Sequence, residues 1–173
     1  MAETPTRPRV YLTLGTVSFG AVEVLRRAIA ETAALDVDLL VTVGSEGEPS
    51  ALDAVPDNVH VERFVAQSAV LPLVDLIVHH GGTGTVLSAL EVGLPQLLLP
   101  QGADQFFNAE ILTEAGAGRG LPNDAQHPGA IGEAVQALLG NAPERRTAAK
   151  LRDEIAAMPS PADVVPELVK LTG

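Results

Sequence analysis

The sequence contains no cysteine and no tryptophan, and only one tyrosine and four phenylalanines among its 173 residues. Without cysteine there is no disulfide, no thiolate metal site and no catalytic thiol, so the redox environment of the protein is left open. Basic residues are also scarce, because 11 Lys and Arg stand against 22 Asp and Glu, a formal net charge of -11. Nucleic-acid duplexes and anionic membranes bind through clustered Lys and Arg. The charge therefore argues against both as partners.

Long apolar runs are missing as well. No stretch reaches the length that a membrane-spanning helix needs, and residues 1–8 lack the apolar segment of a secretory signal. We therefore predict a soluble, cytoplasmic protein without a membrane partner. Pro5 and Pro8 lie among polar neighbours, so residues 1–8 are predicted to be a linker or disordered lead-in and residues 9–173 a single domain.

What the sequence has is an alternation of short apolar runs with helical patterns, and apolar residues make up 46% of it. Alternating strands and helices imply right-handed crossovers and a parallel sheet. The predicted fold class is α/β, a Rossmann-like parallel sheet with helices on both faces. The expected strands are Val10–Leu14, Val37–Val43, Val59–Val61, Leu76–Val78 and Gln96–Leu99. The expected helices are Val22–Ala34, Ser68–Leu73, Thr83–Val92, Gln105–Glu114, Pro128–Leu139, Pro143–Ala157 and Ala162–Leu171.

Sheets of this kind bind ligands in the crevice beyond the carboxyl ends of their strands, and the most specific motif falls there. It reads Leu76-Ile-Val-His-His-Gly-Gly-Thr-Gly-Thr85, a buried-strand pattern that runs into a glycine-rich turn and then a helix. Glycine lets a backbone approach an oxyanion, and free amides at a helix start hold phosphate. His80 and Thr85 could add further hydrogen bonds. The alternative is an ordinary tight turn that contains a core histidine.

Three other interpretations of this motif conflict with its spacing. Gly82-Thr-Gly84 begins like a dinucleotide fingerprint, but the third glycine would fall at Leu87, which argues against a dehydrogenase. His80-Gly-Gly82 is similar to the oxyanion loop of lipases, but the sequence has no Gly-x-Ser-x-Gly elbow. His79 and His80 are neighbours on a strand and point to opposite faces, so they cannot easily share a metal ion. We expect no metal and no cofactor, and we expect His79 to be packed in the interior.

A second motif, Pro100-Gln-Gly-Ala-Asp-Gln105, stands between an apolar strand and a helix. An adjacent carboxylate and amide, Asp104 and Gln105, can accept from and donate to the vicinal hydroxyls of a sugar. Asp104 could instead simply cap the helix. Asp36-Val-Asp38 is assigned to an exposed turn and not to a metal site, because it lies where a helix hands over to a strand, at the amino end of the sheet.

Together these motifs resemble the donor half of the B-type (GT-B) glycosyltransferase superfamily, in the branch that contains macrolide and other natural-product glycosyltransferases. The resemblance covers residues 9–171. Four segments carry it, in the order and spacing of the family: Arg63-Phe-Val-Ala-Gln67, His79-His-Gly-Gly-Thr-Gly-Thr85, Gly93-Leu-Pro95 and Leu99-Pro-Gln-Gly-Ala-Asp-Gln-Phe-Phe-Asn-Ala109.

The resemblance implies a binding role for each matching position. Phe64 stands where plant relatives have tryptophan, which leaves the base open, and Ser88 stands where they have a glutamate that holds the ribose. The implied substrate is a dTDP- or UDP-sugar. The diphosphate would be held by Thr16, His80, Gly82, Gly84 and Thr85, the nucleoside by Phe64, Val65, Gln67 and Ser88, and the sugar hydroxyls by Asp104 and Gln105.

The resemblance also implies what a partner must supply. Family enzymes are about twice as long, and their amino-terminal domain provides the acceptor pocket and a histidine general base. Inverting transfer needs that base to deprotonate the acceptor hydroxyl. We therefore expect no catalytic residue in this chain, which alone would bind donor and transfer little or no sugar. The acceptor domain would act in cis, or in trans if the chain is a naturally separate, non-catalytic donor-binding subunit.

Overall fold

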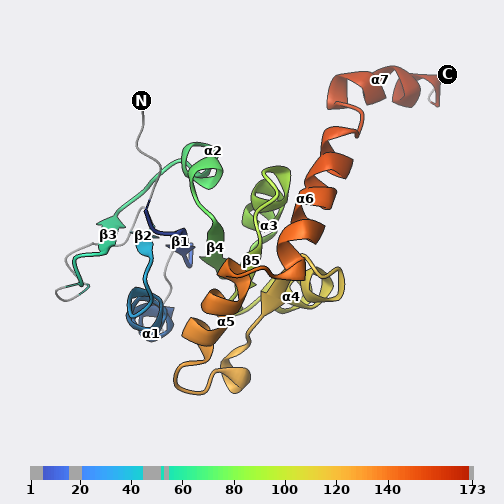
Figure 1. Ribbon diagram of the computed structural model, residues 1–173. Helices are drawn as coiled ribbons and strands as arrows, with labels where there is room; N and C mark the ends of the chain where they lie inside the picture. Colours follow the sequence, from blue (N-terminus) through green and yellow to red (C-terminus); the bar gives the residue numbers. More distant parts are fainter. Residues whose placement is uncertain (1–5, 16–20, 45–51, 53–54, 172–173) are drawn as a thin grey trace.

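The computed structural model of the protein describes residues 6–15, 21–44, 52 and 55–171. Its centre is a six-stranded sheet with the strand order β3-β2-β1-β4-β5-β6, and every pairing in it is parallel (Figure 1). The predicted α/β fold class is confirmed. The strands are β1 (Arg9–Thr13), β2 (Asp38–Thr42), β3 (Val59–Glu62), β4 (Leu76–His79), β5 (Gln96–Leu98) and β6 (Gly118–Gly120).

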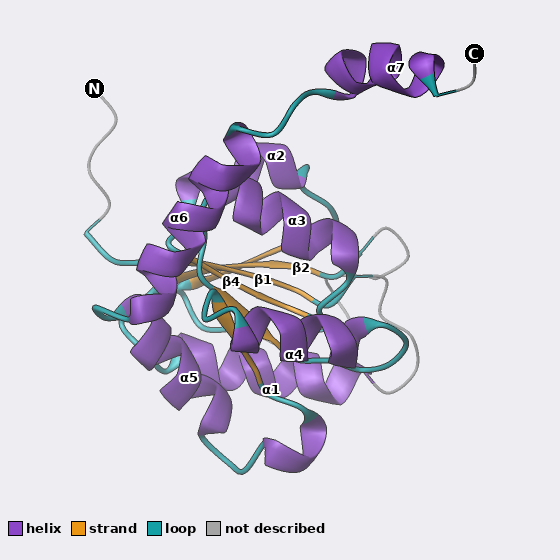
Figure 2. Cartoon of the chain, turned by 90° about the vertical axis from the view of Figure 1, so that its right-hand side faces the viewer, coloured by secondary structure: helices purple, strands orange, loops and turns teal. Residues whose placement is uncertain are grey.

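Helices cover both faces of this sheet, which lies as a layer between them (Figure 2). On one face pack α1 (Ala21–Ala33) and α5 (Ala130–Leu139), which also contact each other. A short 3₁₀ helix, η3 (Asn123–Ala125), precedes α5. On the other face lie α2 (Gln67–Val70) with its 3₁₀ continuation η2 (Leu71–Leu73), α3 (Thr83–Glu91), α4 (Gln105–Glu114) and α6 (Pro143–Ala156).

The alternation of side chains along the strands divides the core between these two faces. Val10 and Leu12 of β1 pack on the side of α1 and α5, whereas Tyr11 and Ile77 pack on the side of α2 and α3. The central strands are buried on both faces, which is why their sequences are nearly continuous apolar runs. His79 is two residues after Ile77 and points to the same face, where it is completely buried.

The order of the strands reverses beside β1, and this determines which loops meet. β1 pairs with β2 on one side and with β4 on the other. The chain therefore runs outward to β3, returns to the centre at β4 and continues to β6. Such a switch point is where parallel sheets open a crevice at the carboxyl ends of their strands. The loops that leave β1, β4 and β5 begin side by side at this edge.

The sequence does not predict two short elements, β6 and η3. β6 has the sequence Gly-Arg-Gly, which carries no apolar pattern. A Cβ at Gly118 would lie 2.6 Å from the Gln96 carbonyl oxygen, so glycine permits the close approach of β6 to β5. The helix expected from Pro128 begins at Ala130, because Gly129 precedes it with a φ of +89°.

The last helix, α7 (Pro161–Lys170), stands away from the rest of the molecule (Figure 1, Figure 2). Local signals form it, since Ser160 and Asp163 make a reciprocal capping box and Pro161 occupies its first turn. Its apolar residues Val165 and Leu168 are more than half exposed. Within the described residues, no helix has the length and apolar composition that crossing a membrane requires.

Candidate functional site

The glycine-rich motif forms the turn between β4 and α3. Gly81 adopts a φ of +94°, and Gly82 is the N-cap of α3 without a side-chain capping bond. The amide of Thr85 donates to the Gly82 carbonyl at 3.0 Å. The helix therefore leaves the amides of Thr83 and Gly84 at its start without intrahelical acceptors. These two groups lie at the positive end of the α3 dipole, where an anion is favoured.

Gly84 differs from the other glycines of the turn, because no contact among the described residues requires a glycine there. A Cβ at Gly81 would lie 3.1 Å from the Gln105 carbonyl oxygen, and a Cβ at Gly82 would lie 2.5 Å from His80 Nε2. At Gly84 the φ is not positive, and a Cβ would meet no atom within 4 Å in the part of the chain that the structure describes. The space beside Gly84 is thus open.

His79 is an interior residue, as the sequence predicts. Its Nδ1 accepts a hydrogen bond from the Gly81 amide at 3.1 Å, and its Nε2 is 2.9 Å from Gln96 Oε1. Because Nδ1 accepts, the proton of the neutral ring is assigned to Nε2, which donates to Gln96. Burial lowers the pKa of His79 to about 3, although the bond to Gln96 acts in the opposite direction. His79 is therefore neutral at physiological pH.

His80 is half-buried and packs between two glycines of different loops. Cβ atoms built at Gly15 and Gly82 would lie 3.0 and 2.5 Å from its ring, so both positions make room for the imidazole. Its Nδ1 is buried and has no hydrogen-bond partner among the described residues. Burial lowers the pKa of His80, and a hydrogen bond to the Thr13 main chain and the charge of Asp104 offset only part of this effect. The ring sits at the junction of the loops after β1 and β4.

Asp104 does not cap α4 with its side chain, which was the alternative open from the sequence. Its Oδ2 instead accepts from Thr83 Oγ1 at 2.8 Å and from Asn108 Nδ2 at 3.0 Å. These bonds, with Thr83 as the largest contribution, lower the pKa of Asp104. The preceding Ala103 has a φ of +52°, a left-handed conformation that non-glycine residues rarely adopt. The loop before α4 is thus shaped to present Asp104 to the start of α3.

The side-chain oxygen of the neighbouring Gln105 accepts hydrogen bonds from its own loop. Its Oε1 accepts from the amides of Gln101 at 2.8 Å and Gly102 at 3.1 Å. The amide nitrogen of the Gln105 side chain is then the atom that can serve as a donor. Gly102, like Gly84, has open space where a Cβ would stand.

Phe64, Val65 and Gln67 lie on the segment that joins β3 to α2. Phe64 is 71% exposed, whereas Val65 packs against the core on the α2 side. The segment borders a hollow of about 390 Å³ at the carboxyl ends of β1 and β2. The hollow is lined by Tyr11, Thr13, Gly15, Thr42, Gly44, Arg63, Phe64, Val65 and Gln67. An exposed aromatic ring thus stands at its rim.

The structure joins these segments to the glycine-rich turn. Gln67 Nε2 donates to Thr85 Oγ1 at 3.2 Å, and Ser88 follows Thr85 by one turn of α3. Residues predicted on three separate loops therefore meet at one edge of the sheet. Thr16 lies outside the described residues; the neighbouring Gly15 ends the described part of the loop after β1 with a φ of +72°.

The sequence interpretation gives no role to three side chains that shape this site: those of Thr83, Gln96 and Asn108. Asn108 Nδ2 donates to the Gly81 carbonyl at 2.8 Å and is 3.1 Å from Thr83 Oγ1. The available signal was that Asn108 follows Asp104 by four residues, which places both on one face of a helix. Gln96 gave a signal too, because a buried amide inside an apolar strand needs partners.

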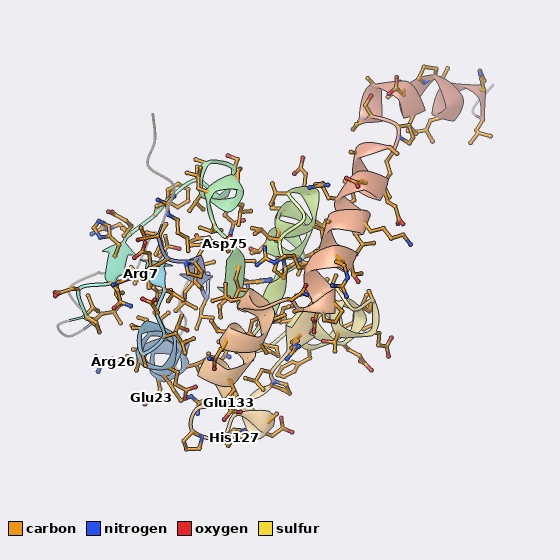
Figure 3. All side chains as sticks on the ribbon, in the orientation of Figure 1. Arg7, Glu23, Arg26, Asp75, His127 and Glu133 are labelled. Atoms are coloured by element: carbon orange, nitrogen blue, oxygen red, sulfur yellow. The ribbon has the colours of Figure 1, made fainter. Side chains whose placement is uncertain are left out.

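Asp36 lies in an exposed bend before β2, as the sequence predicts, whereas Asp38 is the exposed first residue of β2. The Asp36 side chain is 85% exposed and pairs with Arg7 at 2.9 Å. Asp75, labelled with Arg7 in Figure 3, accepts from the amide of Arg9, the first residue of β1, at the amino edge of the sheet. In the ranges that the structure describes, no three His, Asp or Glu side chains are grouped closely enough to hold a metal ion.

Comparison with known proteins shows that this chain is similar to one part of several longer proteins. A family model described as "Erythromycin biosynthesis protein CIII-like, C-terminal domain" matches residues 26–171. The chain is 38% identical over 168 residues to an L-demethylnoviosyl transferase of Streptomyces niveus, a match that covers 95% of this chain and 44% of the relative. It is 35% identical over 167 residues to a 3-alpha-mycarosylerythronolide B desosaminyl transferase of Saccharopolyspora erythraea, covering 93% of this chain and 39% of the relative.

A solved structure also matches nearly the whole of this chain. The spinosyn rhamnosyltransferase SpnG complexed with thymidine diphosphate has a TM-score of 0.85 and 33% identity, covering 96% of this chain and 46% of that chain. The chain therefore spans less than half the length of the relatives that it matches.

Proposed function

Because this chain belongs to the family of erythromycin biosynthesis protein CIII-like C-terminal domains, we propose that it is the donor-binding half of an inverting glycosyltransferase. The donor is a nucleoside diphosphate sugar, and the acceptor is a small-molecule natural product. One observation carries the proposal: the glycine-rich turn, the Phe64 segment and the Asp104 loop meet at the switch point of the sheet.

The diphosphate is assigned to the start of α3. The amides of Thr83 and Gly84 and the hydroxyl of Thr85 offer donors to its oxygens, and the helix dipole favours the charge. Gly84 leaves open space there, so a phosphate can approach the main chain. His80 supplies a ring whose buried Nδ1 lacks a partner among the residues that the structure describes. Gly82 and Thr16 complete the set proposed for the diphosphate. Donors of this kind explain how a protein of net charge -11 can bind an anion.

The nucleoside is assigned to the hollow beside Phe64. The exposed ring at its rim offers a face for stacking, and Val65 anchors the segment in the core. Gln67 orients the Thr85 hydroxyl by donating to its oxygen, which links the nucleoside end to the diphosphate end. Ser88 stands one turn further along α3 and is proposed to contact the ribose. We propose dTDP as the nucleotide, because SpnG was solved with thymidine diphosphate at 33% identity.

The sugar is assigned to Asp104 and Gln105. Asp104 has one carboxylate oxygen held by Thr83 and Asn108, so the other is directed to accept from a sugar hydroxyl. The Gln105 amide nitrogen can donate, because its oxygen is bonded to the Gln101 and Gly102 amides. The pair therefore presents one acceptor and one donor side by side, which suits vicinal hydroxyls.

In the reaction, this half of the enzyme acts on the leaving group. As the acceptor oxygen attacks the anomeric carbon, the bond from that carbon to the diphosphate breaks and negative charge grows on the diphosphate. Amides and a helix dipole that already point at this group stabilise the charge without reorganisation. The acceptor pocket and the general base are proposed to come from the amino-terminal half of a longer enzyme or from a partner subunit. The chain alone is then expected to bind donor and to transfer little or no sugar.

Isothermal titration of the 173-residue chain with dTDP and UDP tests this function. We expect dTDP to bind more tightly than UDP, and both His80→Ala and Thr85→Ala to weaken binding. His127→Ala and Thr147→Ala are the matched controls, because His127 lies in the loop before α5, at the bottom of the molecule in Figure 3, and Thr147 lies on α6. The proposal is wrong if the unaltered protein binds neither nucleotide at millimolar concentration.

A further inference from the structure

Gly81 is the residue at which the chain turns from β4 into the proposed diphosphate site, and side chains hold both of its main-chain groups. Its amide donates to His79 Nδ1 at 3.1 Å, and its carbonyl accepts from Asn108 Nδ2 at 2.8 Å. Its φ of +94° lies in the region that favours glycine. The conformation of this turn therefore depends on two side chains that come from different elements, β4 and α4.

The first of these side chains, His79, is itself held by a hydrogen bond to Gln96. His79 Nε2 bonds to Gln96 Oε1 at 2.9 Å, and Gln96 Nε2 donates to the Val86 carbonyl at 3.3 Å. His79 and Gln96 are both completely buried. A chain of hydrogen bonds thus runs from the Gly81 amide through β4 and β5 to the first turn of α3. Buried networks whose members are all satisfied hold one arrangement firmly.

The second side chain, Asn108, approaches the turn from α4. Besides the Gly81 carbonyl, its Nδ2 lies 3.0 Å from Asp104 Oδ2 and 3.1 Å from Thr83 Oγ1. Asn108 is half-buried, so it closes the outer side of the turn while His79 closes the inner side. The turn is held between them.

We propose that His79, backed by Gln96, and Asn108 are positioning residues for the diphosphate: they fix Gly81 and thereby aim the amides of Thr83 and Gly84 at the ligand. This inference rests on the proposed function. A turn that is fixed before binding loses no conformational entropy when the ligand arrives, and its dipoles need no reorganisation. Both residues act through Gly81, and Asn108 acts also through Thr83 and Asp104; neither acts by touching the ligand.

Asn108→Ala is the sharper test, because Asn108 is only half-buried and alanine is favourable inside a helix. We expect the affinity for dTDP to fall about tenfold, the equivalent of one hydrogen bond, with little change in melting temperature. Amide hydrogen exchange measured by NMR should become faster at residues 81–85. Glu110→Ala, on the exposed side of α4, is the matched control and should change neither quantity.

Two substitutions of His79 separate its two bonds. His79→Asn can place an oxygen near the position of Nδ1 and keep the acceptor for Gly81, whereas His79→Gln reaches toward Gln96 and loses that acceptor. We expect His79→Asn to retain more dTDP affinity than His79→Gln. Leu138→Ala, in the core on the opposite face, loses stability without weakening dTDP binding.

The inference is overturned if Asn108→Ala and His79→Gln bind dTDP as the unaltered chain does, or if Leu138→Ala weakens binding as much as they do. In either case the proposed function still stands, because the unaltered chain binds. If the unaltered chain binds neither dTDP nor UDP, the proposed function fails and this inference fails with it.

Discussion

The Thr83 hydroxyl donates to Asp104 Oδ2 across 2.8 Å and so joins the start of α3 to the loop before α4. Residues proposed for the diphosphate and residues proposed for the sugar are thus parts of one hydrogen-bonded unit. Asn108 donates to the same oxygen at 3.0 Å. Because Oδ2 is occupied twice, Oδ1 is the oxygen that we expect to face a sugar hydroxyl.

Asp104→Ala should therefore separate recognition of the sugar from recognition of the diphosphate. We expect the affinity for dTDP-glucose to fall about tenfold, since a hydrogen bond to a charged group is lost. The affinity for dTDP should not fall, because Asp104 adds negative charge near the phosphates and gives them no donor. Titration calorimetry with the two ligands measures the difference. An equal loss for both ligands would show that Asp104 acts on the nucleotide and not on the sugar.

Gly84→Ala should raise stability and lower affinity in the same protein. Glycine inside a helix costs about 0.5–1 kcal/mol relative to alanine, and a Cβ at Gly84 meets no atom of the described residues within 4 Å. The same methyl group would stand where the diphosphate approaches the amides. Thermal unfolding and dTDP titration of one preparation test both effects. Unchanged affinity would mean that the space beside Gly84 does not hold the ligand.

The sequence predicts the parallel sheet and the edge at which its ligand loops meet, because apolar runs and glycine-rich turns are local signals. It does not predict β6, since Gly118 is required by the approach of its own backbone to the Gln96 carbonyl oxygen, a contact between distant segments. For the same reason the roles of Gln96 and Asn108 are missing from the sequence interpretation. Asn108 holds the Gly81 carbonyl and Gln96 holds the His79 ring, and both contacts join segments that are distant in the sequence.

The atoms that can contact a ligand depend on which atoms already form hydrogen bonds within the protein. The sequence places Asp104 and Gln105 next to each other, but only the structure shows that one Asp104 oxygen and the Gln105 oxygen are bonded within the protein. Likewise the sequence favours free amides from Gly82 to Thr85, whereas the Thr85 amide closes onto the Gly82 carbonyl. The amides of Thr83 and Gly84 are therefore the ones that helix geometry leaves available to a ligand.

The buried histidine makes stability depend on pH. The pKa of His79 is about 3 in the folded protein and 6.5 in its ordinary state, so below pH 6.5 the unfolded chain binds a proton that the folded chain does not. The free energy of unfolding should therefore fall with decreasing pH, by up to about 1.4 kcal/mol per unit from this group. Burial also lowers the pKa of His80, which acts in the same direction.

Urea unfolding of the unaltered protein and of His79→Gln at pH 7, 6 and 5 checks this expectation. The variant has no titrating group at this position, so the difference in unfolding free energy between the two proteins should shrink as the pH falls. A difference that stays constant over this range would show that His79 is not buried in its neutral form.

Truncation after Met158 should leave the domain intact. Every residue of α7 whose side chain the structure describes is exposed, so removing the helix sacrifices little buried surface. We expect the melting temperature to change by less than about 2 °C, within the range of ordinary surface changes, and the affinity for dTDP to stay the same. A fall of many degrees would show that α7 packs on the domain in solution.

The most direct measurement is a crystal structure of the 173-residue chain with dTDP bound. We expect the diphosphate oxygens to lie within hydrogen-bonding distance of the Thr83 and Gly84 amides and of the Thr85 hydroxyl, with the base beside Phe64. A diphosphate bound at any other edge of the sheet, or a start of α3 covered by protein side chains, would contradict the proposed site.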